Sequence, residues 1–216
     1  MIKRVIFDID NTLIDWKTEY NDKVKEVLDK FNEKREEAEI KKLQEALNEY
    51  ENYYLTFNLD KMVEFVRKYT DINYSKEIIK GILDMWGTCV PQFCPIENIE
   101  TLKYLKDKYE LVILTDWFLK PQFNRLKLLK IDKFFSKIYT AENAKRKPNK
   151  EAFIQAIGEY KPEECIMIGD SYERDVIGAI NSGLYAVWYR GKKEMCENLN
   201  EKVTIIEELS DLKDIL

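Results

Sequence analysis

The chain contains no histidine, and this absence excludes more chemistry than any other feature of its composition. Without an imidazole there is no Ser/His/Asp or Cys/His triad, no phosphohistidine and no histidine metal site. Any acid–base work must therefore fall to carboxylates, lysine, tyrosine or cysteine.

Cysteine is scarce, and long apolar runs are missing. Cys89, Cys94, Cys165 and Cys196 show no CxxC spacing, which argues against a zinc site or a disulfide scaffold and favours reduced, buried thiols. The opening MIKRVIFDID has too short an apolar run for a signal peptide, and no segment reaches the roughly 18 apolar residues of a membrane helix. We therefore expect a cytoplasmic protein without a membrane partner.

An excess of positive charge is also missing. The chain has 35 Lys and Arg against 40 Asp and Glu, a net charge of -5, which argues against a dedicated nucleic-acid binder but leaves small anionic substrates open. Its 216 residues are long for one small domain and short for two, so we expect one core with an insertion. The oligomeric state stays open.

Proline and glycine are absent from the first 80 residues, because all five prolines lie between Pro91 and Pro162 and the first glycine is Gly81. After an opening strand, this part should be mostly helical. Apolar residues recur at helical spacing in four stretches, 20–31, 40–54, 59–66 and 78–86. Asn58 and Ser75 are the expected N-caps of the last two helices.

Beyond Pro91 short apolar runs alternate with helical stretches, a pattern that indicates a parallel sheet. The predicted strands are 111–115, 137–141, 165–170 and 184–189, with 203–206 as a candidate edge strand. The predicted helices are about 97–108, 119–130, 149–160 and 173–182. The predicted fold class is α/β, a Rossmann-like parallel sheet core flanked by helices with an inserted α-helical cap domain. The predicted domains are a core of 1–15 and 90–216 and a cap of 16–89.

Polar residues follow the predicted inner strands, where an open parallel sheet binds its ligands. They are Asp8 and Asp10, then Thr115 and Asp116, then Lys147, then Asp170 and Asp175. Two carboxylates about 4 Å apart repel by about 4 kcal/mol at an effective dielectric of 20, so their clustering calls for a cation. A hard divalent ion that accepts carboxylates, water and phosphate fits best, and we therefore expect Mg2+.

Each of these residues also has an ordinary structural explanation. Asp8 and Asp10 are residue types that are common in turns, and Thr115 is a residue type that suits the end of a strand. Lys147 could be an ordinary solvated lysine in a loop, and acids such as Asp170 are common at helix starts. The functional interpretation depends on all four groups appearing together and in this order.

With these motifs in place, the chain resembles a phosphatase of the haloacid-dehalogenase-like superfamily. "DIDNT" at 8–12 matches the first motif, Thr115 the second, Lys147 with Pro148 the third and "GDSYERD" at 169–175 the fourth. The resemblance covers nearly the whole chain, and the helical insertion lies where that family places its smaller type of cap.

The resemblance implies that Asp8 attacks phosphorus to form an aspartyl-phosphate, and that Asp10 protonates the leaving oxygen and then activates water. In the dehalogenase branch the position of Asp10 does not carry the general acid, because halide needs no protonation on leaving. Asp10 therefore favours a phosphatase that hydrolyses a small phosphorylated metabolite.

The resemblance also assigns the binding residues. Mg2+ would be held by the Asp8 carboxylate, the backbone carbonyl of Asp10 and Asp170, with Asp175 in support. The phosphoryl oxygens would be held by Thr115, the backbone N–H of Asp116 and Lys147. Thr12 would brace the turn after Asp8.

Some positions depart from the family pattern or bear on the substrate. Asn11 stands where glycine is frequent, and Asp116 and Trp117 stand where asparagine or glycine is common, so the Asp116 carboxylate is expected near the site. Trp117 is a possible substrate contact. The candidates for a leaving-group pocket in the insertion, which equally suit a helical core, are Trp16, Tyr53, Tyr54, Phe57 and Trp86.

Three other functions remain open at this point. A phospho-receiver uses similar residues but places its acceptor aspartate after a middle strand and has no such insertion. A phosphotransferase or sugar-phosphate mutase of the same fold would share every motif. A non-catalytic binding protein is disfavoured because no catalytic position is missing.

Overall fold

Six parallel strands form one sheet in the computed structural model, which describes residues 1–14, 20–89, 94–191 and 200–216. The strands are β1 (Arg4–Phe7), β2 (Glu110–Thr115), β3 (Lys137–Thr140), β4 (Cys165–Gly169), β5 (Tyr185–Tyr189) and β6 (Val203–Ile206). Their spatial order is β3-β2-β1-β4-β5-β6. The predicted α/β class and parallel sheet are confirmed, including the edge strand at 203–206.

β1 lies in the middle of the sheet, and its register with both neighbours aligns the three strand ends. Phe7 pairs with Ile113 of β2 on one side and with Ile168 of β4 on the other. The next backbone N–H, that of Asp8, donates to the Ile168 carbonyl at 2.9 Å. The residues that follow these three strands therefore meet at one edge.

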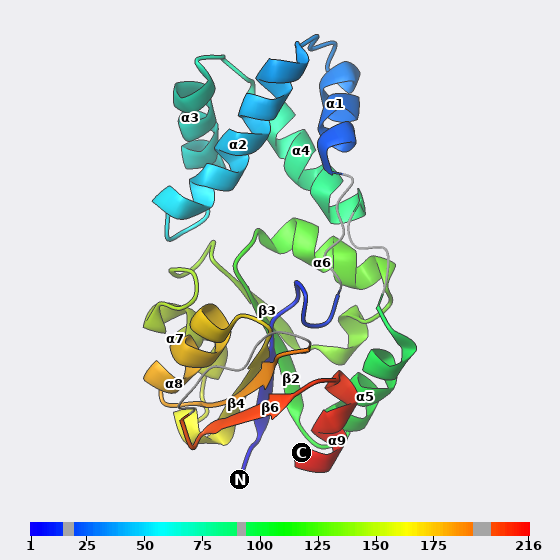
Figure 1. The fold of residues 1–216 in the computed structure, drawn as a ribbon, viewed down its shortest axis with the longest axis vertical. Coiled ribbons are helices and arrows are strands. Elements are labelled where there is room, and N and C mark those ends of the chain that lie inside the picture. The colour runs from blue at the N-terminus through cyan, green and yellow to red at the C-terminus, as the bar shows by residue number, and fades with distance from the viewer. Residues whose placement is uncertain (15–19, 90–93, 192–199) are drawn as a thin grey trace.

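Helices cover both faces of the sheet (Figure 1). They are α5 (Ile96–Lys106), α6 (Leu119–Leu128), α7 (Lys150–Ile157), α8 (Gly178–Asn181) and α9 (Leu212–Ile215), with the 3-10 helices η1 (Asp132–Phe134), η2 (Pro162–Glu164) and η4 (Leu209–Asp211) and the π-helix η3 (Tyr172–Ile177). Val5 and Phe7 face one apolar cluster, which includes α5 and α9 residues, and Ile6 faces another, which includes α7 and α8 residues. This alternation is expected of a strand buried on both faces.

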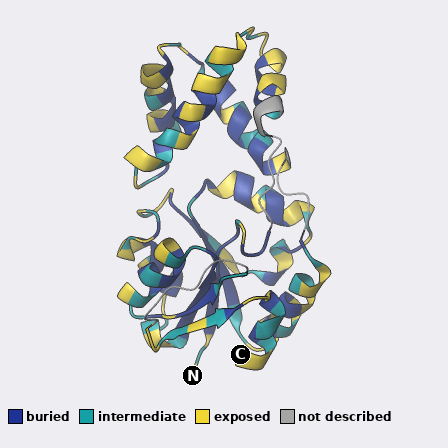
Figure 2. Ribbon diagram, in the orientation of Figure 1, coloured by how far each residue is buried: buried dark blue, intermediate teal, exposed yellow. Residues whose placement is uncertain are grey.

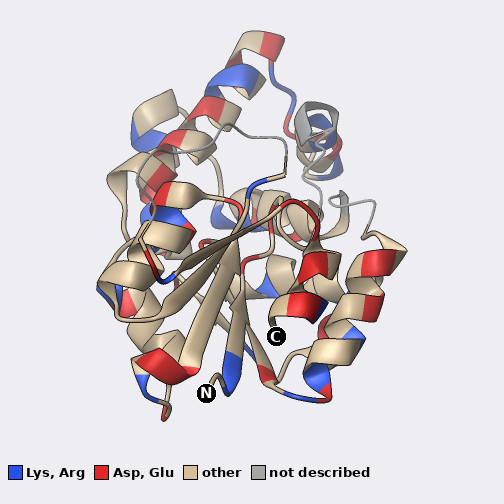
Figure 3. Cartoon of the chain, turned by 60° about the horizontal axis from the view of Figure 1, so that its bottom comes forward, with Lys and Arg blue, Asp and Glu red and all other residues tan. Residues whose placement is uncertain are grey.

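The central strands are buried and nearly uncharged, whereas charged residues lie on the helices and loops (Figures 2 and 3). Two predicted helices differ clearly from the elements that form, one in where it ends and one in its type. α7 ends at Ile157 rather than near 160, because Gly158 takes a φ of 62° that a helix cannot continue through. The helix predicted over 173–182 consists of η3 followed by α8, because the chain at Tyr172–Ile177 adopts the wider π-helical turn.

Four helices are inserted between β1 and β2 and pack on one another above the sheet (Figure 1). They are α1 (Tyr20–Lys30), α2 (Glu37–Tyr53), α3 (Leu59–Thr70) and α4 (Lys76–Cys89). The predicted caps are present: the Asn58 side chain accepts from the Lys61 N–H at 3.1 Å, and Ser75 Oγ accepts from the Ile78 N–H at 3.2 Å. The predicted domain boundaries adjoin residues 15–19 and 90–93, outside the described ranges, and stay predictions.

The insertion shares an apolar core with the loop that follows β2. Trp117 and Phe118 belong to the same buried cluster as Tyr50 and Phe57. Phe57 stacks on Phe118 with ring centroids 5.5 Å apart, and the Phe57 N–H donates to the Ala141 carbonyl at 2.8 Å. This contact fixes the end of the insertion nearest the sheet over the strand ends.

Candidate active site

The predicted site residues come together at the carboxyl edge of the sheet. Asp8 directly follows β1, Thr115 is the last residue of β2, and Asp170 directly follows β4. Lys147 reaches the same edge from the loop between β3 and α7, and Asp175 reaches it from η3. The parallel topology therefore gathers residues that are up to 167 positions apart in the sequence (175 minus 8).

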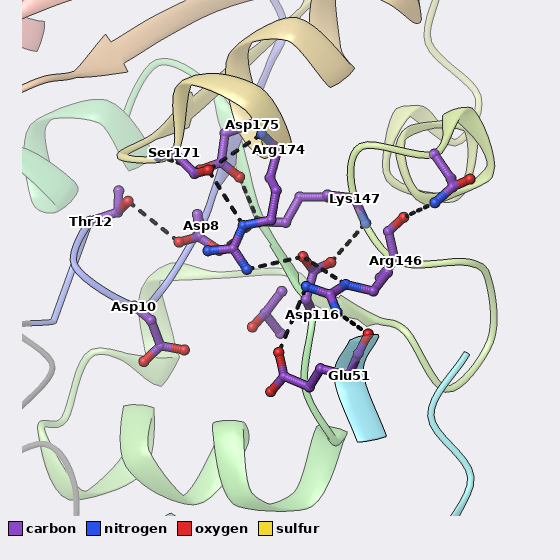
Figure 4. Close-up of polar contacts among 12 residues, drawn as sticks. Asp8, Asp10, Thr12, Glu51, Asp116, Arg146, Lys147, Ser171, Arg174 and Asp175 are labelled. Carbon is purple, nitrogen blue, oxygen red and sulfur yellow. Dashed lines mark hydrogen bonds and ion pairs between the residues drawn. The ribbon is translucent and has the colours of Figure 1, made fainter. Parts of the chain in front are cut away.

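Lys147 ties two of the carboxylates together (Figure 4). Its Nζ lies 2.6 Å from Asp8 Oδ1 and 2.6 Å from Asp175 Oδ1. The lysine is 3% exposed, and Asp175 is 1% exposed. Such a buried ammonium is stable only with acceptors of this kind, and here it offsets part of the negative charge of the site.

The pKa values reflect this crowding. Although burial lowers the pKa of Lys147, the carboxylates of Asp175 and Asp8 raise it above that of an ordinary lysine, so the amine stays charged. Burial raises the pKa of Asp8 to about 8; Lys147 opposes the rise, and the charges of Asp175 and Asp10 add to it. The single positive charge of Lys147 is thus not enough to offset the burial of Asp8 and the negative charges beside it.

Three carboxylates meet the geometric requirement for holding a metal ion. Asp8, Asp170 and Asp175 each offer an oxygen within 4.8 Å of the other two. Both Asp175 oxygens already have protein partners, because Oδ1 accepts from Lys147 and Oδ2 accepts from the Ser171 N–H at 2.9 Å. Asp175 is therefore engaged in holding Lys147 and the η3 turn as well as lying within reach of a shared cation. An all-oxygen donor set with excess negative charge fits a hard divalent cation such as Mg2+.

Gly169 explains how Asp175 comes so close to the strand end. A Cβ built on Gly169 would lie 2.3 Å from Asp175 Oδ2, which is far inside van der Waals contact. Only glycine leaves room for this carboxylate, which explains on steric grounds why the "GDSYERD" motif begins with glycine.

Asp10 points away from Asp8 in the structure (Figure 4). Its Oδ2 accepts from Gln122 Nε2 at 3.0 Å, and its Oδ1 lies 2.5 Å from an Nη atom of Arg125. Thr12, predicted to brace the turn, places its hydroxyl 3.5 Å from Asp8 Oδ2. Asn11 between them has a φ of 61°, a left-handed conformation that asparagine tolerates and glycine adopts freely.

Asp116 holds the third-motif loop in place. Its Oδ1 accepts from the Lys147 backbone N–H at 2.9 Å, and its Oδ2 lies 4.0 Å from Arg146 and 3.8 Å from Arg174. The carboxylate is thus next to the site, as expected, and its charge faces two guanidinium groups. Arg146 also contacts the insertion, because it donates to the Glu51 carbonyl at 2.5 Å.

A cavity of about 270 Å³ opens between the insertion and the sheet edge. It is lined by Asp8, Asp10, Asn11, Asn48, Glu51, Trp86, Thr115, Asp116, Trp117, Lys147 and Arg174. Trp117 reaches it from an aromatic cluster, with its ring 4.9 Å from that of Trp86.

Of the aromatic candidates in the insertion, Trp86 lines this cavity. Tyr53 is 70% exposed, Tyr54 stacks on Tyr50, and Phe57 is buried in the apolar core. Trp16 lies outside the described residues.

Sequence reasoning missed the residues that reach the site from α6, because the burial of this helix is the reverse of what its apolar pattern predicts. Gln122 and Arg125 lie on the buried side of α6, while the apolar Leu119, Phe123 and Leu128 are exposed. Polar residues on the inward face of a helix that follows a functional strand end indicate site residues. Arg146, in a loop, and Arg174, in η3, were missed because basic residues near loops and helix starts are usually solvated.

The family model of the haloacid dehalogenase-like hydrolases matches this chain over residues 5–189. The chain belongs to the haloacid dehalogenase-like hydrolase family. This match spans every motif residue from Asp8 to Asp175, and it confirms the family expected from those motifs.

A curated relative, the glyceraldehyde 3-phosphate phosphatase of Methanothermobacter thermautotrophicus, is 28% identical over the full length of both chains. A haloacid-dehalogenase-family phosphatase from Thermococcus onnurineus has a similar structure, with 26% identity, a TM-score of 0.67 and coverage of 99% of this chain and 97% of that one. A 2-haloacid dehalogenase from Pseudomonas syringae, 21% identical over 100% and 98% of the two chains with a TM-score of 0.73, shares the fold. The expectation of a phosphoric monoester hydrolase agrees with the hydrolase family and the phosphatase names of these relatives.

Proposed function

We propose that this chain is a magnesium-dependent phosphatase that hydrolyses a small phosphate monoester through an aspartyl-phosphate at Asp8. One observation carries the proposal: the buried Lys147 holds Asp8 at the floor of a cavity, with Asp170 close enough to share a cation. The phosphatase-named relatives support the same reaction class.

In the proposed reaction Lys147 and Thr115 bind the phosphoryl oxygens, and a carboxylate oxygen of Asp8 attacks phosphorus. The bond from phosphorus to the leaving oxygen breaks, and that oxygen takes a proton from Asp10. Asp10 then removes a proton from the water that attacks phosphorus, which releases inorganic phosphate and regenerates the Asp8 carboxylate. The arrangement needs no histidine.

The proposed magnesium ligands are the carboxylates of Asp8 and Asp170 and the backbone carbonyl of Asp10. The ion would supply positive charge that lets a phosphoryl dianion approach a carboxylate. Asp175 would support the site by fixing Lys147, to which it is bonded.

The helical insertion would act as a cap over the cavity. Asn48, Glu51 and Trp86 reach the cavity from α2 and α4, opposite the catalytic residues on the sheet. Such a cover excludes water while the acyl phosphate exists.

Among the described residues no helix is both long and apolar enough to span a bilayer. A location in the cytoplasm stays a prediction.

The cavity favours a short, hydroxylated substrate. Its volume of about 270 Å³ lies at the lower end of ligand cavities, which run from about 300 to 1,000 Å³. Glu51 and Asn48 offer hydrogen-bond acceptors for hydroxyl groups.

A phosphate-release screen tests this substrate class. With Mg2+, we expect kcat/KM to be highest for triose and other short sugar phosphates, glyceraldehyde 3-phosphate among them, and at least about tenfold lower for nucleoside monophosphates, whose bases exceed the cavity. A preference for nucleoside monophosphates would contradict the proposed class. Isomerisation of a bis-phosphorylated sugar without net phosphate release would instead identify a mutase.

Magnesium should stabilise the fold more at high pH than at low pH. The folded-state pKa of Asp8, about 8, is above its ordinary value of 3.8, so its ionisation destabilises the metal-free fold progressively as pH rises between these values. Magnesium binds the ionised carboxylate. We therefore expect the rise in Tm caused by Mg2+, relative to EDTA, to be larger at pH 8 than at pH 5.

The Asp8→Asn variant is the control for this measurement, because it carries no titrating group at that position. Its magnesium-induced rise in Tm should be smaller and should vary less with pH. An equal rise at both pH values in the unaltered protein would show that magnesium does not bind at Asp8.

A further inference from the structure

The α6 residues Gln122 and Arg125 contact both oxygens of the Asp10 carboxylate, Gln122 by a hydrogen bond and Arg125 by an ion pair. Gln122 Nε2 donates to Oδ2 at 3.0 Å, and Arg125 lies 2.5 Å from Oδ1. Both α6 side chains are 0% exposed, whereas the Asp10 side chain is 32% exposed. Two fully buried side chains, one neutral and one charged, therefore hold a carboxylate that itself lines the cavity.

The two α6 residues also fix each other. They stand three positions apart, on the same face of the helix, and an Nη atom of Arg125 donates to Gln122 Oε1 at 2.5 Å. Arginine can only donate, so its partner on Gln122 must be the carbonyl oxygen, and the amide nitrogen is left to face Asp10. The orientation of the Gln122 amide is thus determined by Arg125.

The same amide nitrogen contacts the phosphate-binding residue. Gln122 Nε2 donates to Thr115 Oγ1 at 2.8 Å as well as to Asp10. A hydroxyl that accepts a hydrogen bond still has its own proton to donate. Gln122 therefore leaves the Thr115 proton available for a phosphoryl oxygen.

We propose that Gln122 and Arg125 are positioning residues that hold Asp10 in place for proton transfer, and that Gln122 also orients the Thr115 hydroxyl. This inference rests on the proposed function, in which Asp10 is the acid and base. The two residues touch Asp10 and each other, and act on the reaction through Asp10 and Thr115. Neither belongs to the motifs at the strand ends.

The dependence of the rate on the leaving group tests the proposal. Glycerol 3-phosphate has a poor leaving group that requires protonation, whereas 2,4-dinitrophenyl phosphate has a good one that does not. For both, kcat/KM reports the steps up to departure of the leaving group. The Asp10→Asn variant lacks the acid altogether. It therefore shows how far kcat/KM for glycerol 3-phosphate falls, relative to kcat/KM for 2,4-dinitrophenyl phosphate, when the leaving group receives no proton.

We expect Arg125→Met and Gln122→Met to lower kcat/KM for glycerol 3-phosphate at least about tenfold more than for 2,4-dinitrophenyl phosphate. Gln122→Met should also raise the inhibition constant of inorganic phosphate several-fold, through Thr115, while Arg125→Met, which keeps the Gln122 amide and removes only its orienting partner, should raise it by less. The ratio of kcat/KM values for the two substrates thus reports the positioning of Asp10, and the inhibition constant of phosphate reports the positioning of the Thr115 hydroxyl.

Arg4→Met is the matched control for loss of a buried arginine. Arg4 is 5% exposed and is held by Glu110 and the Ala156 carbonyl at 2.8 Å each, at the opposite end of β1 from Asp8. Its removal should lower stability without changing the ratio of the two substrates.

Equal losses on both substrates in the α6 variants would overturn the proposal, since they would show a merely structural role. If Arg125→Met does not fold, the ratio measured for Gln122→Met decides the question alone. If Asp10→Asn itself shows no leaving-group selectivity, the proposed function fails and the positioning role fails with it. A selective Asp10→Asn beside unselective α6 variants overturns the positioning role only.

Discussion

Replacement of Asp8 by asparagine is expected to lower magnesium-dependent hydrolysis of 4-nitrophenyl phosphate by roughly 10⁴- to 10⁶-fold, as loss of a covalent nucleophile does. The amide keeps the size of the carboxylate and can still accept from Lys147, so the site geometry is retained. It cannot attack phosphorus as an ionised oxygen does. The measurement is steady-state release of nitrophenolate.

The fold should survive this substitution, and its metal-free stability should not fall. Burial and the neighbouring Asp175 and Asp10 raise the pKa of Asp8, which means that the ionised side chain destabilises the folded state at neutral pH. A neutral amide removes that charge, so we expect the Tm in EDTA to equal or exceed that of the unaltered protein.

A surface carboxylate provides the control for Asp8→Asn. Asp84 pairs with Lys80 and Lys120 on the surface, away from the cavity, and Asp84→Asn should leave turnover unchanged. Retained turnover in Asp8→Asn would refute the covalent mechanism. Acid quench of the unaltered protein during turnover should give a peptide containing Asp8 that is heavier by one phosphoryl group.

Replacement of Lys147 by methionine should damage both activity and stability. Lys147 is the buried cation that contacts Asp8 and Asp175, and it is proposed to bind a phosphoryl oxygen. Loss of such a donor typically costs about 10²–10³-fold in kcat. Removing one partner from a buried ion pair costs about 3–5 kcal/mol, because the other charge is left uncompensated.

Lys145→Met is the matched control for this second variant. Lys145 pairs with Glu151 at 2.6 Å, but both side chains are about half exposed, at 46% and 49%. Such pairs contribute about 0.2–1 kcal/mol, so the control should unfold at nearly the same urea concentration as the unaltered protein and retain full turnover. If Lys147→Met were as stable and as active as Lys145→Met, the buried lysine would have neither proposed role.

Magnesium should lessen the stability loss in Lys147→Met. Without the ammonium, Asp8 and Asp175 lose their shared cation, and a divalent ion at Asp8 and Asp170 would replace part of that positive charge. We therefore expect Mg2+ to raise the Tm of this variant more than that of the unaltered protein at pH 8.

Local pattern alone was enough to predict the elements and the class of the fold. The stretch Val5–Phe7, followed by acids, predicts a buried strand that ends at a site, and β1 ends at Phe7 with Asp8 next. Asn58 and Ser75 cap α3 and α4 as predicted, because capping depends on a side chain and an amide a few residues away. These features depend on residues that are close together in the sequence, and they can therefore be predicted from it.

The strand-end motifs also determined which residues share the site, since parallel strands bring their carboxyl ends to one edge. Asp8, Thr115 and Asp170 meet there because β1 lies between β2 and β4. The order of the motifs along the chain therefore indicates which residues lie together in space.

Only the tertiary structure showed how the side chains pair. The turn from η3 brings Asp175 onto Lys147, and the packing of α6 brings Gln122 and Arg125 onto Asp10. Hydrophobic periodicity predicts α6 as a helix but assigns its polar residues to solvent, whereas the folded chain buries Gln122 and Arg125 against Asp10. Sequence pattern specifies which elements form and where their ends meet, whereas the partners of buried charges are decided by distances that exist only after the elements have packed.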